Sequence, residues 1–300
     1  MIPAFLIFAL SAYFLLALVG LIDKILLQTT LISPRAYAFY VGLLSAAAVV
    51  LLPFGVVQVP DLRLILSAFV SGVAGVYALW AFYEALKSHE ASRVIITVGA
   101  LVPVFTLLFS VIFLNEHFEF FQLLAFALLV LGGVLISYQE NIKKPYTLEL
   151  FHHAARAAVL FAVSFTLLRF VFLFEPFLNG LFWTRMGGVI GAATIIAIPE
   201  NFRRIYWATK KAPKTAPIPF LVNQAAGGVG AILQNYAVFL GSAALVGVLQ
   251  GVQYAFLLIL IILLSRYFPQ LKEEFSRRAI IQKGFAIVLI ALGLVILAVG

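Results

Sequence analysis

The sequence predicts an all-α protein that crosses a membrane with about ten helices, and three observations carry this prediction. Of the 300 residues, 64% are hydrophobic and only 11% are charged, whereas soluble domains carry about 25% charged residues. Continuous apolar runs, each long enough to span a hydrocarbon layer of ~30 Å as a helix, recur along almost the whole chain. These runs do not alternate apolar and polar residues, so they favour helices over barrel strands.

The first run begins at Ile2 and is interpreted as a helix of the mature protein. It has no basic segment ahead of it and no small-residue cleavage site before Asp23 and Lys24. Polar residues, proline or glycine separate it from nine later runs. The expected spans are 3–22, 36–56, 64–86, 92–114, 119–138, 154–174, 178–198, 217–240, 243–265 and 280–299. The longest connections, 139–150, 200–216 and 266–279, are too short to fold as separate domains.

A connection at 141–150 divides the chain into two predicted five-helix repeats, residues 1–140 and 151–300. A few positions match between the halves: Gly99 with Gly251 and Ala91 with Ala243 at an offset of about 152, and Leu131-Gly132 with Leu292-Gly293 after a short insertion. Five spans in each half place the second copy upside down, and inverted repeats are typical of transporters. Chance can also supply so few matches among apolar residues.

The stretch from Ala85 to Ser137 resembles the EamA-type repeat of the drug/metabolite transporter superfamily. Its matching points are a turn of small residues into the fourth span, Pro103 inside that span, Asn115-Glu116 at its end, and Gly132-Gly133 in the fifth span. Lys24 at the end of the first span and the segment SPRAYAFYVGLLSA at the start of the second are also similar to that repeat.

The second half is less similar to the repeat. Ala255 stands in the ninth span in place of the proline, and Phe268-Pro269 stands where Asn115-Glu116 would recur. The resemblance implies ten helices in a 5+5 inverted repeat around a central cavity, lined mainly by the first, third, fourth, sixth, eighth and ninth spans. It also implies solute transport, by alternating access between the two sides, but no particular substrate.

Basic residues favour one orientation in the membrane. Seventeen of the twenty lie on the odd-numbered connections: Lys24, Arg35, Lys87, Arg93, Lys143, Lys144, Arg156, Arg203, Arg204, Lys210, Lys211, Lys214, Arg266, Lys272, Arg277, Arg278 and Lys283. The positive-inside rule places these connections in the cytoplasm and both termini outside. Members of the family usually look like the reverse, but the bias is large and present in both halves. We therefore expect the first orientation, in a cell (inner) membrane.

Composition also excludes several function classes. A net charge of +8 does not indicate a nucleic-acid partner, because the basic residues lie in short loops at the membrane surface. The absence of cysteine excludes disulfides, cysteine-ligated zinc and iron–sulfur clusters, and we expect neither a cofactor nor a metal. The sequence has no HExxH motif, no glycine-flanked acid pair deep in a span and no serine matched in depth to a histidine, so an enzyme is not expected.

Polar side chains at bilayer depth are candidate site residues, because burying them unsatisfied is costly. In the third span Tyr77, Trp80 and Glu84 share one helical face. They form either a cavity wall whose acid meets a substrate amine or a proton, or an interfacial aromatic belt with Glu84 paired to Lys87 or a headgroup.

The eighth span carries two adjacent polar stripes. They are Asn223, Gly227, Gly230 and Gln234 beside Gln224, Gly228, Ala231 and Asn235. Amides flanking small residues admit either a close helix neighbour or a ligand lying against bare backbone. In the ninth span Gln250, Gln253 and Tyr254 place three hydrogen-bonding groups in one turn.

Arginines mark the sixth and seventh spans. Arg185 lies about two turns inside the seventh, and Arg169 lies near the end of the sixth, with Glu175 between them. One interpretation is a structural salt bridge of Glu175 with one arginine while the other snorkels. The alternative is a clamp for a carboxylate or phosphate, with Tyr13 and Lys24 on one face of the first span and Lys24 as a second anion contact.

Three further features complete the candidate set. Pro103 removes one helical hydrogen bond and is a candidate kink or gating residue. His152 and His153 with Arg156 are interpreted as an interfacial basic cluster. The first span has no acid before Asp23, so proton coupling would use Glu84 or Asp23, and facilitated exchange stays open.

We therefore expect a secondary carrier, a monomer or dimer in the lipid bilayer, for a small-molecule substrate. An amino acid or similar zwitterion suits the mixture of aromatic, amide and few charged groups. Phosphorylated or nucleotide-linked metabolites are the alternative, and they would use Arg169, Arg185 and Lys24 more heavily. A proton or counter-solute is the expected coupling partner. A membrane-embedded enzyme and a channel or scaffold are the alternatives of a different class.

Overall fold

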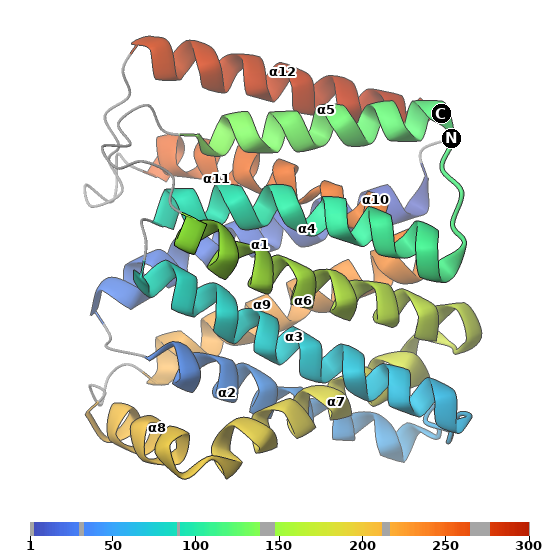
Figure 1. Ribbon diagram of the computed structural model, residues 1–300, viewed down its shortest axis with the longest axis vertical. Coiled ribbons are helices and arrows are strands. Elements are labelled where there is room, and N and C mark those ends of the chain that lie inside the picture. The colour runs from blue at the N-terminus through green and yellow to red at the C-terminus, as the bar shows by residue number, and fades with distance from the viewer. Residues whose placement is uncertain are drawn as a thin grey trace.

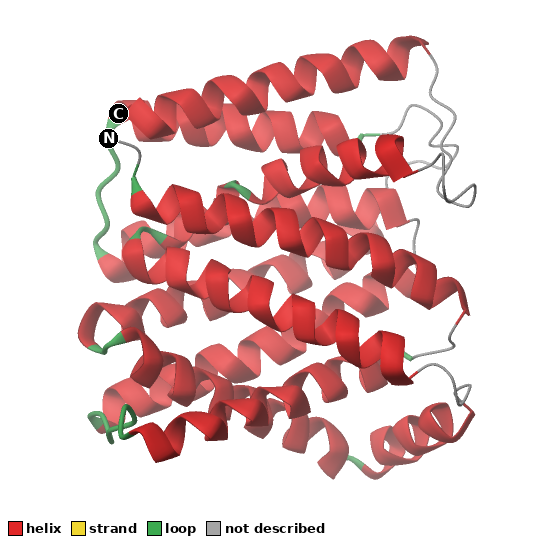
Figure 2. Ribbon diagram, turned by 180° about the vertical axis from the view of Figure 1, so that it is seen from behind, coloured by secondary structure: helices red, strands yellow, loops and turns green. Residues whose placement is uncertain are grey.

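A computed structural model describes residues 3–29, 33–88, 91–138, 148–211, 217–264 and 277–299. This described part is built from helices and short connections, without a strand (Figure 2). The elements are α1 (Ala4–Thr29), α2 (Pro34–Leu44), the 3₁₀ helix η1 (Ser45–Phe54), α3 (Leu62–Ser88), α4 (Ala91–Leu114), α5 (Phe120–Ser137), α6 (Leu148–Phe174), α7 (Phe177–Ala197), α8 (Pro199–Lys211), α9 (Pro217–Leu240), α10 (Ala243–Val248), α11 (Gln250–Leu264) and α12 (Arg277–Val299).

Each of the ten predicted spans corresponds to one helical segment. The second is α2 followed by η1, and the ninth is α10 followed by α11. Among the described residues, eight segments are long and apolar enough to cross a bilayer, and α5 adds a shorter apolar stretch, Phe120–Ile136. The predicted fold class, an all-α polytopic membrane protein, is confirmed.

The spans lie side by side, roughly parallel or antiparallel, as Figure 1 shows. Both termini lie at one end of the bundle, as an even number of crossings requires, and α8 lies at the other (Figure 1). We call these the terminal end and the α8 end.

Local sequence signals set several helix ends. The hydroxyl of Ser33 caps α2 by accepting a hydrogen bond from the N–H of Ala36 at 3.2 Å, and Pro34 occupies the first turn, where its missing N–H is not needed. After α4, Asn115 has a φ of 51°, the left-handed conformation that asparagine tolerates beyond a helix C-terminus. Asparagine thus turns the chain between α4 and α5.

Three predicted boundaries are wrong. Residues 199–211, expected as part of a connection, form the amphipathic helix α8; α6 begins at Leu148 rather than at 154; and α1 continues to Thr29 rather than ending at 22. In each case the additional helical residues include polar ones. Hydropathy locates the apolar part of a helix and misses the turns that project beyond it.

Glycines bring α3 and α7 into backbone contact. A Cβ added to Gly72 would overlap the carbonyl oxygen of Thr184, and one added to Gly187 would lie 2.6 Å from the carbonyl oxygen of Phe69. Side chains cannot be added at these positions unless the helices separate. Lipid tails are as apolar as leucine, so close packing of small residues is a main source of helix association in a bilayer.

The contact between α5 and α12 is reciprocal. Each helix presents a glycine to two residues of the other: Gly132 faces Ile290 and Ala286, and Gly293 faces Leu129 and Ala125. Adding 161 to positions 125, 129 and 132 gives 286, 290 and 293. Each helix therefore shows the other the same pattern, as a pseudo-two-fold axis between two related halves requires.

The α3–α6 and α1–α9 contacts match in a similar way. In each contact a polar side chain donates to a backbone carbonyl of the partner helix, and a glycine one turn later lies against the same partner residue. In α3, Ser71 donates to the Ser164 carbonyl and Gly75 lies against Ser164. In α9, Asn223 donates to the Val19 carbonyl and Gly227 lies against Val19. The offset between these pairs is 152, the offset at which the two halves of the sequence match. The inverted repeat stays a prediction, which these contacts support.

Candidate functional site

The two polar stripes of α9 face different neighbours. Asn223 donates to the Val19 carbonyl at 3.3 Å, and Gln234 donates to the Tyr13 hydroxyl at 3.1 Å, so the first stripe packs on α1. In the second stripe Gln224 donates to the Tyr37 hydroxyl of α2 at 2.7 Å. The packing interpretation therefore holds for the first stripe, and ligand binding at the second stripe stays a prediction.

Glycines on the two stripes show the same division. A Cβ on Gly230 would lie 3.0 Å from Leu16, whereas one on Gly228 would have no neighbour within 4 Å. The second stripe thus leaves bare backbone beside open space, which a ligand can approach closely.

Tyr13 joins three helices in the interior of the bundle. Its side chain is almost fully buried, and its hydroxyl donates to the Val246 carbonyl of α10 at 2.8 Å while accepting from Gln234 of α9. A tyrosine with both partners is stable at membrane depth. The structure therefore brings the predicted site residues Tyr13 and Gln234 together, but as a packing contact between helices.

Tyr254 of α11 lies against the backbone of α4. A Cβ on Gly99 would lie 2.5 Å from the Tyr254 hydroxyl oxygen, so only glycine leaves room for this ring. Pro103, four residues further along α4, is fully buried and supplies no N–H to the Gly99 carbonyl. α4 remains helical through the proline. A weakened turn of α4 and a tyrosine hydroxyl thus coincide, and gating by Pro103 stays a prediction.

Arg185 is the charged residue nearest the middle of a span in the candidate set. It lies eight residues into α7, roughly 12 Å along the helix axis. With the Asn235 amide of α9 turned so that its nitrogen donates to the Ala231 carbonyl, its oxygen accepts from the Arg185 guanidinium at 3.3 Å. Within the described ranges no carboxylate pairs with Arg185. An amide does not neutralise a guanidinium, so this position favours an anionic partner.

Glu84 belongs to a cluster at the α8 end, which we call the α8-end cluster: Arg35, Trp80, Glu84, Arg156 and Glu200. The Glu84 carboxylate accepts from the Trp80 indole at 2.8 Å and from Arg156 of α6 at 3.0 Å. Arg35 of α2 lies 3.9 Å from both Glu84 and Glu200, and stacks over Trp80 at 5.5 Å. The cluster ties α2, α3, α6 and α8 together.

This arrangement corrects the local interpretation of Glu84. Its partner is Arg156 of another helix rather than Lys87, because the carboxylate points across the bundle toward α6. Arg156, expected in a basic cluster with His152 and His153, is therefore an ion-pair residue. Tyr77 shares the face as predicted: its ring lies 5.6 Å from Trp80 and its hydroxyl 3.1 Å from the Thr194 hydroxyl.

A second charged group, the terminal-end cluster, consists of Glu116, Arg169 and Ser242. Arg169 of α6 pairs with Glu116 at 3.3 Å and also donates to the carbonyls of Val238 and Phe239 at 3.0 and 2.8 Å. Ser242, which caps α10, donates to the other Glu116 oxygen at 2.7 Å.

The predicted pairing of Glu175 with an arginine is wrong. Glu175 accepts a hydrogen bond from Asn179 at 2.6 Å, and Arg169 pairs with Glu116 instead. Sequence spacing suggested the nearer acid, whereas the fold brings the loop between α4 and α5 onto α6.

Comparisons with known proteins concern the family of the first repeat and the fold of the whole chain. A family model described as the EamA-like transporter family matches residues 4–138. The match covers the first of the two predicted repeats and agrees with the resemblance found in the sequence. A crystal structure described only as that of a protein is 17% identical, with a TM-score of 0.68, and covers 99% of this chain and 96% of that chain. At that identity the likeness shows a shared fold over almost the full length and nothing of the activity. No curated protein matches the sequence.

The remaining predicted site residues have less defined surroundings. Gln250 is half-buried in the first turn of α11, where the chain restarts after the break at Leu249. The side chain of Lys24 lies outside the described residues, so its predicted anion contact stays a prediction. Sequence reasoning missed Arg35 and Tyr37, which lie near the start of α2, and did not assign a partner to Glu116 of the EamA motif.

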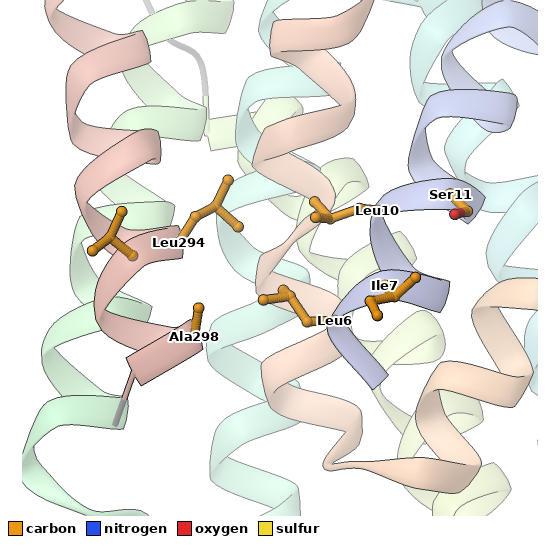
Figure 3. A pocket seen from close by; sticks show the side chains of 7 residues that line it. Leu6, Ile7, Leu10, Ser11, Leu294 and Ala298 are labelled. Atoms are coloured by element: carbon orange, nitrogen blue, oxygen red, sulfur yellow. The ribbon is translucent and has the colours of Figure 1, made fainter. Parts of the chain in front are cut away.

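A surface crevice near the terminal end is a different kind of site. It lies between α1 and α12, has a volume of about 420 Å³, and is lined by Leu6, Ile7, Leu10, Ser11, Leu294, Val295 and Ala298 (Figure 3). Its lining carries one hydroxyl and no charge. Such an apolar surface cannot orient a polar metabolite, so we take Arg185 and the second stripe of α9 as the candidate site.

Proposed function

We propose that this protein is an EamA-type secondary carrier for a small metabolite that carries a carboxylate, with an amino acid or similar zwitterion favoured. The observation that carries the proposal is Arg185, a guanidinium near the middle of α7 whose described partner is the amide of Asn235. A planar guanidinium binds a carboxylate through two parallel hydrogen bonds. Open backbone at Gly228 lies on the same stripe of α9 as Asn235.

Zwitterions are favoured over phosphorylated or nucleotide-linked metabolites, because Arg169, the other candidate arginine, is already paired within the protein. The phosphorylated alternative needs several cations, but Arg169 is held by Glu116 and two backbone carbonyls. Arg185 alone matches a single carboxylate. Tyrosine and amide oxygens, such as those of Tyr37 and Gln224, can accept from an ammonium group.

Alternating access follows if the two charged clusters open in turn. The α8-end cluster links helices at one end of the bundle and the terminal-end cluster links helices at the other. A carrier exposes its site to one side at a time, and inverted repeats supply two related ways of closing. The matched α5–α12 contacts support such a pair of states.

The test is ligand-dependent stability of the purified protein in mild detergent. Amino acids, phosphorylated sugars, nucleotide sugars and lipophilic cations form the panel, and thermal unfolding is the readout. A ligand that binds only the folded state stabilises it by ~2.7 kcal/mol at a hundredfold excess over Kd. We expect a shift for one amino-acid class and none for phosphorylated sugars.

Two variants place the site. Arg185→Gln should abolish the shift, and Gly228→Leu should do the same by filling open space without disturbing the fold. Arg63→Gln, an exposed arginine on α3, is the matched control and should keep the shift. A shift that survives Arg185→Gln contradicts the proposed anchor, whereas stabilisation by phosphorylated compounds alone favours the alternative substrate class. Counterflow in liposomes then separates a carrier from a pore, and product formation would indicate an enzyme.

We further propose that the odd-numbered connections face the cytoplasm of a cell membrane, with both termini outside. The charge bias of seventeen basic residues supports this orientation. Because the chain has no cysteine, single cysteines can report accessibility. A membrane-impermeant maleimide should label Asp61→Cys in intact cells and Tyr138→Cys only after permeabilisation. The opposite labelling pattern would reverse the orientation.

A further inference from the structure

α8 is an amphipathic helix at an outer corner of the α8 end. It packs beside α2 and α7 (Figure 1). The side chains of its inner face are buried or hydrogen-bonded. Ile205 is buried, Asn201 donates a hydrogen bond to the Ile195 carbonyl at 3.2 Å, and the hydroxyls of Thr209 and Tyr40 share a hydrogen bond. The helix is therefore fixed to the bundle by one face and leaves the other exposed.

Exposed aromatic rings cover one part of the outer face of α8. Phe202, Tyr206 and Trp207 are each about half exposed. The rings of Phe202 and Tyr206 stack at 6.4 Å, and those of Tyr206 and Trp207 meet edge to face at 5.6 Å. Amphipathic rings of this kind partition to the headgroup level of a bilayer, which places α8 at the membrane surface.

Basic side chains cover the rest of the outer face. The sequence of α8 has four basic residues and one acid, Glu200, which is paired with Arg204 and Arg35. Arg203 is exposed and has no ion-pair partner among the described residues, and Lys210 lies 5.2 Å over the Trp207 ring. Two cations thus remain for an anion supplied from outside the chain.

We infer that the outer face of α8 binds the phosphate of anionic lipid headgroups. The occupant is the bilayer leaflet itself, because aromatic rings at headgroup depth and unneutralised cations occur on one helix face. Arg203 and Lys210 contact the phosphate, and Phe202, Tyr206 and Trp207 lie beside them at the headgroup level. A basic residue close to an anionic leaflet contributes about 1 kcal/mol, or roughly a fivefold local enrichment of anionic lipid.

Quenching of Trp207 by brominated lipid tests this inference on the full chain. The protein is reconstituted in phosphatidylcholine vesicles that contain a fixed fraction of brominated phosphatidylglycerol or brominated phosphatidylcholine. Fluorescence lost on Trp207→Phe isolates Trp207 from the other two tryptophans. We expect several-fold stronger quenching by phosphatidylglycerol, and we expect high salt to remove the difference.

Charge variants supply the controls. Arg203→Gln and Lys210→Gln should each lower the preference for phosphatidylglycerol and the double variant should remove it, whereas Arg63→Gln at the opposite end of the bundle should leave it unchanged. Circular dichroism confirms that each variant is folded. Equal quenching by the two lipids, or a preference that survives the double variant, overturns the inference. Absence of quenching by either lipid would remove α8 from the membrane surface and overturn it as well.

Discussion

The two charged clusters link helices at opposite ends of the same bundle and differ greatly in burial. At the terminal end, the side chains of Arg169 and Glu116 are only 16% and 15% exposed, and Arg169 also holds two backbone carbonyls. At the α8 end, those of Arg156 and Glu84 are 53% and 36% exposed. A buried pair is costly to break, whereas an exposed pair is weakened by water and salt. The helices are therefore firmly linked at the terminal end and loosely linked at the α8 end.

One helix connects the two ends. α6 contributes Arg156 to the α8-end cluster and Arg169 to the terminal-end cluster, thirteen residues or roughly 20 Å apart along its axis. A rigid tilt of α6 that separates one arginine from its acid changes the position of the other. On this basis we expect the α8 end to open first, since its pair is the weaker of the two.

The largest effect is expected at the terminal end. Arg169→Met should lower the free energy of unfolding by about 3 kcal/mol, because it leaves the Glu116 charge buried without its cation. Unfolding by SDS titration in mixed micelles measures the change. Adding Glu116→Gln to this variant should recover part of the loss. A loss below about 1 kcal/mol for the single variant would show that the terminal end is not the firm one.

The two clusters also show what the sequence could and could not predict. Apolar runs predicted all ten spans, because a helix in lipid must be long, apolar and internally hydrogen-bonded. Glu84 and Trp80 were predicted as neighbours, because i and i+4 positions meet on any helix. Both interhelical ion pairs were missed, since the partner of Glu84 is 72 residues away and that of Glu116 is 53 residues away.

α9 and α8 also show which features of a helix the sequence can predict and which it cannot. The stripes of α9 were visible in the sequence, but only the packing shows that Gln234 faces α1 while Asn235 faces Arg185. α8 carried a recognisable signal in Phe202, Ile205 and Tyr206 at helical spacing, which its low overall hydropathy concealed. Periodicity identifies a helix and its faces, and tertiary contacts decide which neighbour each face meets.

A smaller effect, and a dependence on salt, are expected at the α8 end. A double-mutant cycle with Glu84→Gln and Arg156→Gln should give a coupling free energy of about 0.5 kcal/mol at low salt. This coupling free energy should fall towards zero in roughly 0.5 M NaCl, because salt screens exposed charges. The same cycle on Glu116 and Arg169 should be larger and almost independent of salt. Equal salt dependence in the two cycles would remove the distinction between the ends.

The smallest effect is expected at Glu200, the outermost member of the α8-end cluster. Its side chain is 56% exposed, and it pairs with Arg204 one turn along α8 while lying 3.9 Å from Arg35. A pair at i and i+4 on an exposed helix face contributes about 0.3 to 0.5 kcal/mol, and Arg35 keeps Glu84 and the Trp80 ring as neighbours. Glu200→Gln should therefore change the free energy of unfolding by less than about 0.5 kcal/mol in the same SDS titration. A loss above about 1 kcal/mol would mean that α8 helps to hold the α8 end together, and that the loosely linked end is stronger than its exposure indicates.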